Sequence, residues 1–209
     1  MYKYFKRILD FLISFIALII LSPLFLIIAS WIKTNSPGPI FFKQKRVGKN
    51  KDLFEIYKFR SMRSDTPSDM PTHLLNDPEA FITKSGKFLR KTSLDELPQL
   101  INIVKGEMAI IGPRPALWNQ YDLIEERDKY GANGVRPGLT GWAQINGRDE
   151  LEIPVKAKLD GDYVQNISIL FDLKCFFGTI TSVLRSDGVV EGGTGVIEKA
   201  KQEVKDDQS

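Results

Sequence analysis

Cysteine and histidine are nearly absent from this sequence of 209 residues, which contains one of each, Cys175 and His73. A disulfide framework, a zinc site built from cysteine and histidine, and any catalytic device that needs several histidines are therefore excluded. A strong charge of one sign is also lacking. The 29 Lys and Arg residues face 26 Asp and Glu residues, and the net charge of +3 gives no reason to expect a nucleic-acid partner. The chemistry that remains is that of carboxylates and arginines, with magnesium as the candidate metal.

The one long apolar run lies near the start of the chain and extends from Phe11 to Ile32 without a charged residue. As a straight helix it could cross the roughly 30 Å of a bilayer's hydrocarbon core, so a plain spanning helix is one interpretation. Ser22 and Pro23 lie in its middle, however, and proline breaks or kinks a helix because it lacks an N–H, while a serine hydroxyl can bond a freed carbonyl. Basic residues flank both ends, which favours keeping both on the cytoplasmic side. The run is therefore interpreted as a re-entrant helix hairpin that enters the membrane and returns.

The composition divides the chain into three expected parts. Residues 1–35 form the re-entrant membrane anchor, and a cleaved signal peptide is disfavoured because no small-residue cleavage site follows. Residues 36–197 are sufficient for one compact domain. Residues 198–209 are highly charged and are expected to form a flexible tail.

Within the compact domain the patterns predict an α+β fold that combines amphipathic or interfacial helices with short strands and a β-hairpin. Alternating residues on both sides of Gly48–Lys51 predict the hairpin, whose basic and aromatic side chains could also be ordinary surface. Polar residues 64–77 predict an exposed loop. Apolar residues at helical spacing run through 151–164 and 168–185. The second of these helices either belongs to the core or lies on a bilayer.

Two adjacent acids, Asp95 and Glu96, precede an apolar helical pattern that ends at Gly106. The simple interpretation is helix capping, because Ser93 and Glu96 have the spacing of a capping box. Pro98 suits only a first helical turn, which shifts the expected cap towards residues 94–95. The functional interpretation is that an ionised aspartate at a helix start binds magnesium or attacks phosphorus.

Three loops constrained by glycine and proline each present an arginine. Arg114 lies between two prolines after a short expected strand at 109–111, Arg136 begins a Pro-Gly turn, and Arg148 follows Asn146-Gly147, a strong hairpin signal. A guanidinium offers paired donors to phosphate oxygens, and holding it rigidly lowers the ordering cost of binding. Each loop alone could be turn chemistry, but together with the acids they indicate a polyanion site with a metal.

Over nearly its whole length the chain resembles the bacterial sugar transferase family, the small monotopic polyprenyl-phosphate phosphoglycosyl transferases. The matching landmarks, in chain order, are Ser22-Pro23, Lys58-Phe59-Arg60-Ser61-Met62, Arg90 with Ser93-Leu94-Asp95-Glu96-Leu97-Pro98-Gln99, Gly112-Pro113-Arg114-Pro115, and Arg136-Pro137-Gly138-Leu139-Thr140-Gly141 running into Gln144-Ile145-Asn146-Gly147-Arg148. The resemblance implies an enzyme that transfers a sugar 1-phosphate from a UDP-sugar to polyprenyl (undecaprenyl) phosphate and so initiates surface glycan biosynthesis.

The resemblance also implies roles for particular residues. Asp95 would attack the β-phosphate of the UDP-sugar, releasing UMP and leaving a covalent phosphosugar, and Glu96 would position Mg²⁺ with Asp95 or assist the second attack. The remaining implied site residues are phosphate-binding Arg90, Arg114, Arg148, Lys58 and Arg60, the nucleotide-sugar loop residues Arg136, Pro137, Gly138, Thr140 and Gln144, and the membrane break at Ser22 and Pro23.

The same resemblance places the protein in the bacterial inner (cytoplasmic) membrane as a monotopic protein, with its catalytic domain on the cytoplasmic face and membrane lipids as partners. The resemblance does not determine the oligomeric state, and an oligomer is possible. By the same resemblance, residues 65–67 and 115–120 favour an N-acetylated 6-deoxy amino sugar as the sugar of the donor. The glycine-rich stretch 189–195 has no assigned role. Two alternatives remain: a membrane-anchored scaffold that binds anionic lipid, and a magnesium phosphodiesterase that hydrolyses nucleotide-sugars.

Overall fold

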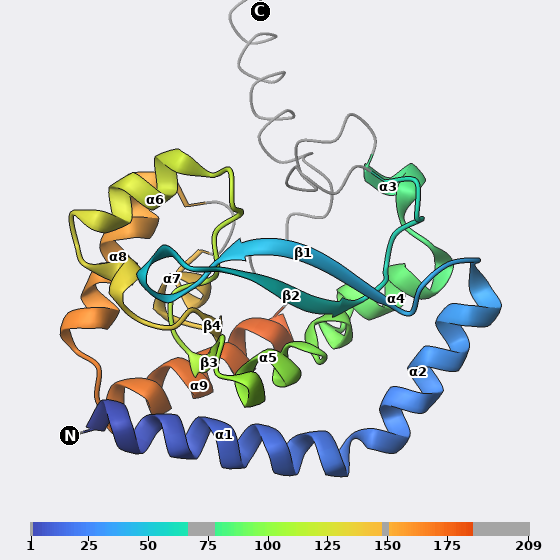
Figure 1. The fold of residues 1–209 in the computed structure, drawn as a ribbon, viewed down its shortest axis with the longest axis horizontal. Helices are drawn as coiled ribbons and strands as arrows, with labels where there is room; N and C mark the ends of the chain where they lie inside the picture. Colours follow the sequence, from blue (N-terminus) through green and yellow to red (C-terminus); the bar gives the residue numbers. More distant parts are fainter. Residues whose placement is uncertain (1, 67–77, 148–150, 186–209) are drawn as a thin grey trace, which may run out of the picture.

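The computed structural model describes residues 2–66, 78–147 and 151–185, in which many helices surround two small pairs of strands (Figure 1). This is the α+β class that the patterns predicted. The expected tail, the glycine-rich stretch, most of the polar loop and Arg148 lie outside the described residues.

The N-terminal apolar run forms two helices, α1 (Tyr2–Ile20) and α2 (Ser22–Asn35), which are bent by 62° at the break between them. Pro23 has no N–H to donate to the Ile19 carbonyl, and the Ser22 hydroxyl donates to that carbonyl instead, at 2.8 Å. The predicted break is therefore confirmed. In the described part of the chain, neither helix alone has the length and apolar character to cross a membrane, whereas the bent pair together passes that test.

Helix α1 buries its polar face and exposes its apolar face, which is the reverse of a helix in a soluble protein. Asp10 and Ser14 are buried on its inner face, and Arg7 donates from that face to the carbonyl of Ile103 in α5. Its outer face is apolar and exposed, through residues such as Phe5, Ile8, Leu12, Ile16 and Ile19. A soluble protein buries its apolar stripe, so this arrangement indicates a surface that meets something other than water.

The predicted β-hairpin is present and lies across the middle of the molecule, between α2 and α5 (Figure 1). Its antiparallel strands are joined by a short 3₁₀ turn, η1, in which Asn50 and Lys51 have positive φ. Phe59 packs with Ile32 of α2, and Ile56 packs with Leu100 of α5. The bounds are β1 (Phe41–Val47), η1 (Lys49–Lys51) and β2 (Leu53–Phe59).

The central segment alternates short helices with two short strands that pair in parallel. Gly112 and Gly138 allow their loops to meet, because a Cβ on Gly138 would lie 2.1 Å from the Gly112 nitrogen. The predicted helix end at Gly106 is confirmed by its φ of 89°. The bounds are α3 (Pro78–Phe81), α4 (Lys84–Lys91), η3 (Leu94–Glu96), α5 (Gln99–Lys105), β3 (Ala109–Ile111) and β4 (Gly138–Thr140).

The remaining helices close the fold on the side of β3 and β4. Asn146 and Gly147 follow a helix rather than a strand, so the hairpin predicted there is wrong: packing of that helix overrides the turn preference of the dipeptide. The two C-terminal helical patterns are confirmed. The bounds are α6 (Tyr121–Asp128), η4 (Ala132–Gly134), α7 (Trp142–Ile145), α8 (Ile153–Gln165) and α9 (Ile169–Arg185).

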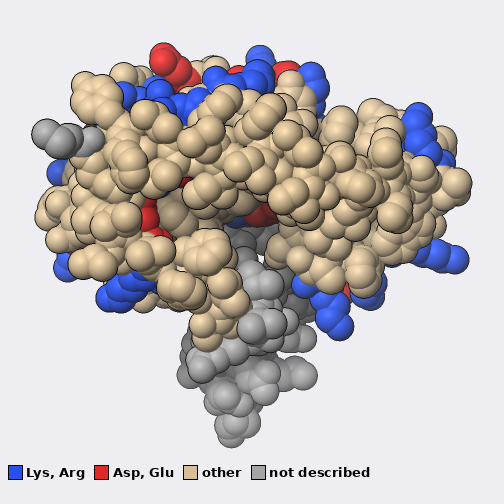
Figure 2. Space-filling model, turned by 90° about the horizontal axis from the view of Figure 1, so that it is seen from below, with Lys and Arg blue, Asp and Glu red and all other residues tan. Residues whose placement is uncertain are grey.

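The outer faces of α1, α2 and α9 share an apolar character. Figure 2 shows the molecule from below, where charged residues are sparse across the face and gather towards its edges. Exposed apolar residues of α2 and α9 continue the stripe of α1, and they include Leu26, Ile27, Ile169, Leu170, Leu173, Phe176 and Phe177. This surface is called the apolar face below.

Candidate active site

The acidic pair lies in the 3₁₀ turn η3, directly before α5. Ser93 enters the turn with a left-handed backbone, φ 56°, and its side chain makes no capping hydrogen bond. Helix α5 begins only at Gln99, after Pro98. The capping-box interpretation is therefore wrong, because the Glu96 side chain turns to two basic groups and not back to the chain at Ser93.

Glu96 is held by two cations from different parts of the chain. Its Oε1 accepts a hydrogen bond from Lys58 Nζ of β2 at 2.7 Å and one from Arg114 Nη2 at 2.9 Å. Burial would raise the pKa of Glu96, but the charges and hydrogen bonds of Arg114 and Lys58 outweigh it and hold the pKa well below its ordinary value. Glu96 is therefore ionised throughout the physiological range.

Asp95 differs sharply from its neighbour. Its side chain is buried, with 6% of the residue exposed, and no hydrogen bond or ion pair reaches it from the described residues. Burial is the largest influence on the pKa of Asp95 and raises it, Glu96 raises it further, and Lys58, Arg90 and Arg114 oppose the rise only in part. The pKa of Asp95 is raised to about 6, which leaves the group mostly ionised at pH 7.

Arg90, in the last turn of α4, completes the basic surroundings of Asp95. Its guanidinium makes one weak contact, from Nη1 to Met62 Sδ at 4.0 Å, and its Nε is buried without a hydrogen bond in the described structure. A buried donor without a partner lowers the stability of the fold, and binding of a ligand at Arg90 could supply the missing acceptor. The fold thus brings together Lys58, Arg90, Asp95, Glu96 and Arg114, the group called the acidic-pair site below.

Arg114 is positioned by a buried ion pair that the sequence patterns did not reveal. Arg127 of α6 donates from Nη2 to the Arg114 carbonyl at 2.9 Å and from Nε to Asp160 of α8 at 2.8 Å. Arg127 and Asp160 are 4% and 1% exposed. Nothing local distinguishes these two helical residues from solvated charges, because their partnership depends on how α6 packs against α8.

Two predicted phosphate-binding or loop arginines bind backbone carbonyls instead of the acidic pair. Arg60 donates to the carbonyls of Ser36 and Pro37 and so fixes the turn after α2. Arg136 donates from Nε to the Gly106 carbonyl at 2.7 Å. A direct role for either in binding phosphate at the acidic pair remains a prediction.

The other predicted loop residues support the loop that carries Arg114. The Pro137 carbonyl accepts from the N–H of Ala109 at the start of β3, and the Gly138 N–H donates to the Pro113 carbonyl. The Thr140 carbonyl accepts from the Gly112 N–H. Gln144 is 5% exposed, and neither polar atom of its amide has a hydrogen bond within the described residues. Buried Gln99, at the start of α5, also has an amide nitrogen without a hydrogen bond in the described structure, and although it ends the Ser93–Gln99 motif, no local pattern predicts this burial.

Among the described residues, no group of three or more histidine, cysteine or acidic side chains could hold a metal ion by itself. The acidic pair offers two carboxylates, and both bonds to Glu96 end on Oε1. Magnesium in proteins is commonly held by one or two carboxylates together with substrate phosphates and water. The pair therefore fits a magnesium ion that arrives with a phosphorylated substrate.

Comparison with known proteins gives one family and several relatives. Residues 1–186 match the family described as bacterial sugar transferase. The exopolysaccharide production protein ExoY of Sinorhizobium fredii (strain NBRC 101917 / NGR234) is 39% identical over 197 residues, which cover 88% of this chain and 87% of the relative.

Two further relatives have names that state a reaction. The UDP-N-acetylgalactosamine-undecaprenyl-phosphate N-acetylgalactosaminephosphotransferase of Aeromonas hydrophila is 38% identical over 195 residues, 90% of this chain and 45% of the relative. The UDP-glucose:undecaprenyl-phosphate glucose-1-phosphate transferase of Escherichia coli (strain K12) is 41% identical over 184 residues, 84% of this chain and 39% of the relative. The chain spans less than half the length of each of these two proteins.

Proposed function

The chain belongs to the bacterial sugar transferase family, and from that premise we propose that it transfers a sugar 1-phosphate from a UDP-sugar to undecaprenyl phosphate. The observation that carries the proposal is the contrast within the acidic pair. Glu96 is neutralised by Lys58 and Arg114, whereas Asp95 is buried, takes no hydrogen bond from the described residues and faces three basic side chains. A carboxylate in that condition is a nucleophile kept free beside a site for phosphate.

The reaction then proceeds in two displacements at one phosphorus atom. A carboxylate oxygen of Asp95 attacks the β-phosphorus of the UDP-sugar, the bond from that phosphorus to the bridging oxygen breaks, and UMP leaves with the bonding electrons. An oxygen of undecaprenyl phosphate next attacks the same phosphorus and breaks the bond to Asp95. The products are the lipid diphosphate sugar and the free carboxylate.

The basic residues supply electrostatic stabilisation for both steps. Arg90 and Arg114 hold phosphate oxygens as charge develops on them, and Lys58 and Arg114 are kept in place beforehand by Glu96. Preorganised charges of this kind cost little to reorganise during the reaction. Glu96 acts mainly by positioning these two cations.

The proposal includes a magnesium ion bound at the acidic pair. Asp95 and the free Oε2 of Glu96 would hold the ion together with the substrate diphosphate, whose negative charge it neutralises when bound. The residues of this chain still determine which oxygen attacks and which cations hold the phosphates.

The apolar face explains how a lipid substrate reaches the site. We infer that α1, α2 and α9 lie in one leaflet as a monotopic anchor, with the apolar face towards the hydrocarbon and the acidic-pair site at headgroup level. The phosphate of undecaprenyl phosphate lies at the same depth. The proposal has the catalytic side of the molecule on the cytoplasmic surface of the inner membrane, because UDP-sugars are made in the cytoplasm.

Intact mass spectrometry of the purified protein with Mg²⁺ and a panel of UDP-sugars, without lipid, tests the covalent step. We expect one sugar phosphate to be added, to be absent from Asp95→Asn, and to be discharged by undecaprenyl phosphate. Asp52→Asn is a matched control, because it makes the same change at an exposed acid outside the acidic-pair site, and it should retain the adduct.

The same experiment separates the alternatives. Lipid-dependent UMP release without any adduct would mean direct transfer, and Asp95 would become a metal ligand. Continuous UMP release without lipid would identify a phosphodiesterase, and the absence of both adduct and release would favour a lipid-binding scaffold. The sugar that forms the adduct identifies the donor, for which an N-acetylated 6-deoxy amino sugar remains the prediction from the sequence.

A further inference from the structure

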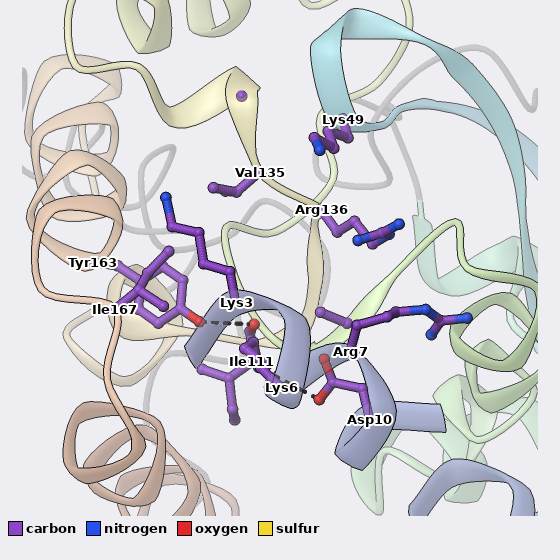
Figure 3. Close-up of a pocket in the computed structure, with 12 residues that line it drawn as sticks. Lys3, Lys6, Arg7, Asp10, Lys49, Ile111, Val135, Arg136, Tyr163 and Ile167 are labelled. Atoms are coloured by element: carbon purple, nitrogen blue, oxygen red, sulfur yellow. Dashed lines mark hydrogen bonds and ion pairs between the residues drawn. The ribbon is translucent and has the colours of Figure 1, made fainter. Parts of the chain in front are cut away.

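A separate cavity of about 210 Å³ lies between α1, η1, β3, η4 and α8 (Figure 3). None of its lining residues belongs to the acidic-pair site. Five basic side chains and one carboxylate line it, contributed by three distant segments: Lys3, Lys6, Arg7 and Asp10 from α1, Lys49 from the hairpin turn, and Arg136. The lining therefore carries a large excess of positive charge.

Three of the five basic groups have structural partners. Lys6 pairs with Asp172 at 2.9 Å and with Asp10 at 3.4 Å. Arg7 donates to the carbonyls of Ile103 and Val104, and Arg136 donates to that of Gly106. Both arginines thus bind the carboxyl end of α5, where the helix dipole offsets only part of their charge.

Lys3 and Lys49 have no such explanation. Neither makes an ion pair or a hydrogen bond with the described residues, and both are exposed at the cavity. Figure 3 shows Lys3 and Lys49 on different elements at the rim of the cavity, with Val135 between the end of the Lys3 side chain and Arg136. An excess of cations around one cavity favours the binding of an anion there, and the two lysines are available to one because they have no partner among the described residues.

We propose that this cavity binds the phosphate group of a second ligand, held by Lys3, Lys49 and the free guanidinium nitrogens of Arg136. A phosphate is the anion that suits several lysine and arginine donors at once, and the volume accommodates it together with a small substituent. The proposal does not depend on the transfer reaction, because the cavity shares no residue with the acidic-pair site.

Two kinds of molecule could supply this phosphate group. Helix α1 supplies one wall of the cavity and also part of the apolar face, so the headgroup of an anionic phospholipid could enter from the membrane. A soluble phosphorylated molecule could enter from the water. The experiment has one arm for each source.

The test measures the unfolding midpoint of the full chain in neutral detergent micelles, because a ligand that binds the folded state raises that midpoint. One arm adds phosphatidylglycerol, with phosphatidylcholine as its neutral reference, and the other adds inorganic pyrophosphate, with chloride at equal ionic strength. The cavity variant is Lys3→Gln with Lys49→Gln. The control is Lys45→Gln with Lys91→Gln, which removes the same charge from exposed positions outside the cavity lining.

We expect the unaltered chain and the control to be stabilised in at least one arm, and the cavity variant to bind roughly tenfold more weakly or worse in that arm. A response only to phosphatidylglycerol that the cavity variant loses assigns the cavity to a lipid headgroup, and a response only to pyrophosphate that the cavity variant loses assigns it to a soluble phosphate. No stabilisation in either arm, or the same stabilisation in the cavity variant and the control, would overturn the proposal. Folding of the cavity variant is not at risk, because neither lysine has a partner in the described structure.

Discussion

At the scale of single residues, two adjacent carboxylates have opposite environments. Asp95 is buried and Glu96 is half-buried in the same 3₁₀ turn, and among the described residues only Glu96 receives side-chain hydrogen bonds, from Lys58 and Arg114. The pKa of Glu96 is consequently held low, while burial raises that of Asp95 to about 6. The difference between the two groups supports the proposed roles, in which Glu96 positions the basic side chains and Asp95 reacts.

The raised pKa of Asp95 predicts an acid limb in the pH dependence of adduct formation. Attack requires the ionised carboxylate, and its ionised fraction falls as pH falls through about 6. We expect the kcat/KM for adduct formation, which reports the free enzyme, to be level above pH 7 and to fall roughly tenfold per unit well below pH 6. Quenched mass spectrometry between pH 5 and 8 measures it, and a level profile down to pH 5 would contradict the assignment.

At the scale of elements, α6 and α8 together hold the loop that presents Arg114. The Arg127–Asp160 pair is fully enclosed, and Arg127 Nη2 also donates to the Arg114 carbonyl. Removing one partner of a buried pair leaves an uncompensated charge, so Asp160→Asn should lower the free energy of unfolding by about 3 kcal/mol. Chemical denaturation measures that loss.

Arg127→Lys isolates the positioning role. It keeps the charge beside Asp160 but cannot reproduce the fork that reaches both Asp160 and the Arg114 carbonyl. We expect kcat to fall roughly tenfold with little change in KM, because Arg114 acts on charge that develops in the transition state. Lys51→Gln is the control: it breaks an exposed ion pair to Asp128, the last residue of α6, and should leave both kcat and stability nearly unchanged. A parallel fall in KM and kcat for Arg127→Lys, or the same result in the control, would remove the positioning role.

The break between α1 and α2 predicts the membrane topology. Single cysteines at Lys3 and Lys33 should both react with a maleimide supplied from the cytoplasmic side, and the native Cys175 does not interfere because it is buried. Pro23→Ala restores the missing N–H and favours a continuous helix by about 3 kcal/mol, so part of the population should then expose the two positions on opposite sides. Labelling from opposite sides in the unaltered background would rule out the re-entrant anchor.

At the scale of the whole molecule, the apolar face unites three helices that are far apart in the sequence. The charged face of α1 is turned inward onto α5 and β3, so the helix exposes the apolar side that a soluble protein would bury. An exposed apolar surface of this kind is typical of a membrane-contact or protein-contact surface, and the proposed anchor assigns it to the membrane.

A charge placed on this face should weaken membrane binding. Leu170 of α9 is 76% exposed, and we expect Leu170→Glu to reduce partition into phospholipid vesicles roughly tenfold. Leu53→Glu is a matched control, since Leu53 is also exposed but begins β2, in the hairpin above α1 (Figure 1). Vesicle flotation measures both, and an equal effect of the two substitutions would mean that α9 does not contact the bilayer.

Local features were predictable because their causes act within a few residues. The missing N–H of Pro23 broke the anchor, Gly106 ended α5, and the alternation around Gly48–Lys51 produced the hairpin. The family and the acidic pair were recognisable from short motifs for the same reason. The Asn146-Gly147 prediction failed because a local turn preference of this size yields to the packing of a neighbouring helix.

The sequence by itself therefore determined the broken anchor, the hairpin, the end of α5 and the position of the acidic pair in the chain. Only the tertiary structure decided which basic side chain lies beside which acid. Lys58, Arg90 and Arg114 come from three segments that only long-range packing brings together. It also separated arginines that look alike in the chain: Arg60 and Arg136 donate to backbone carbonyls, whereas Arg90 and Arg114 face the acidic pair. An arginine's role is set by the groups that burial brings within a few ångströms of it, and those groups are distant in sequence.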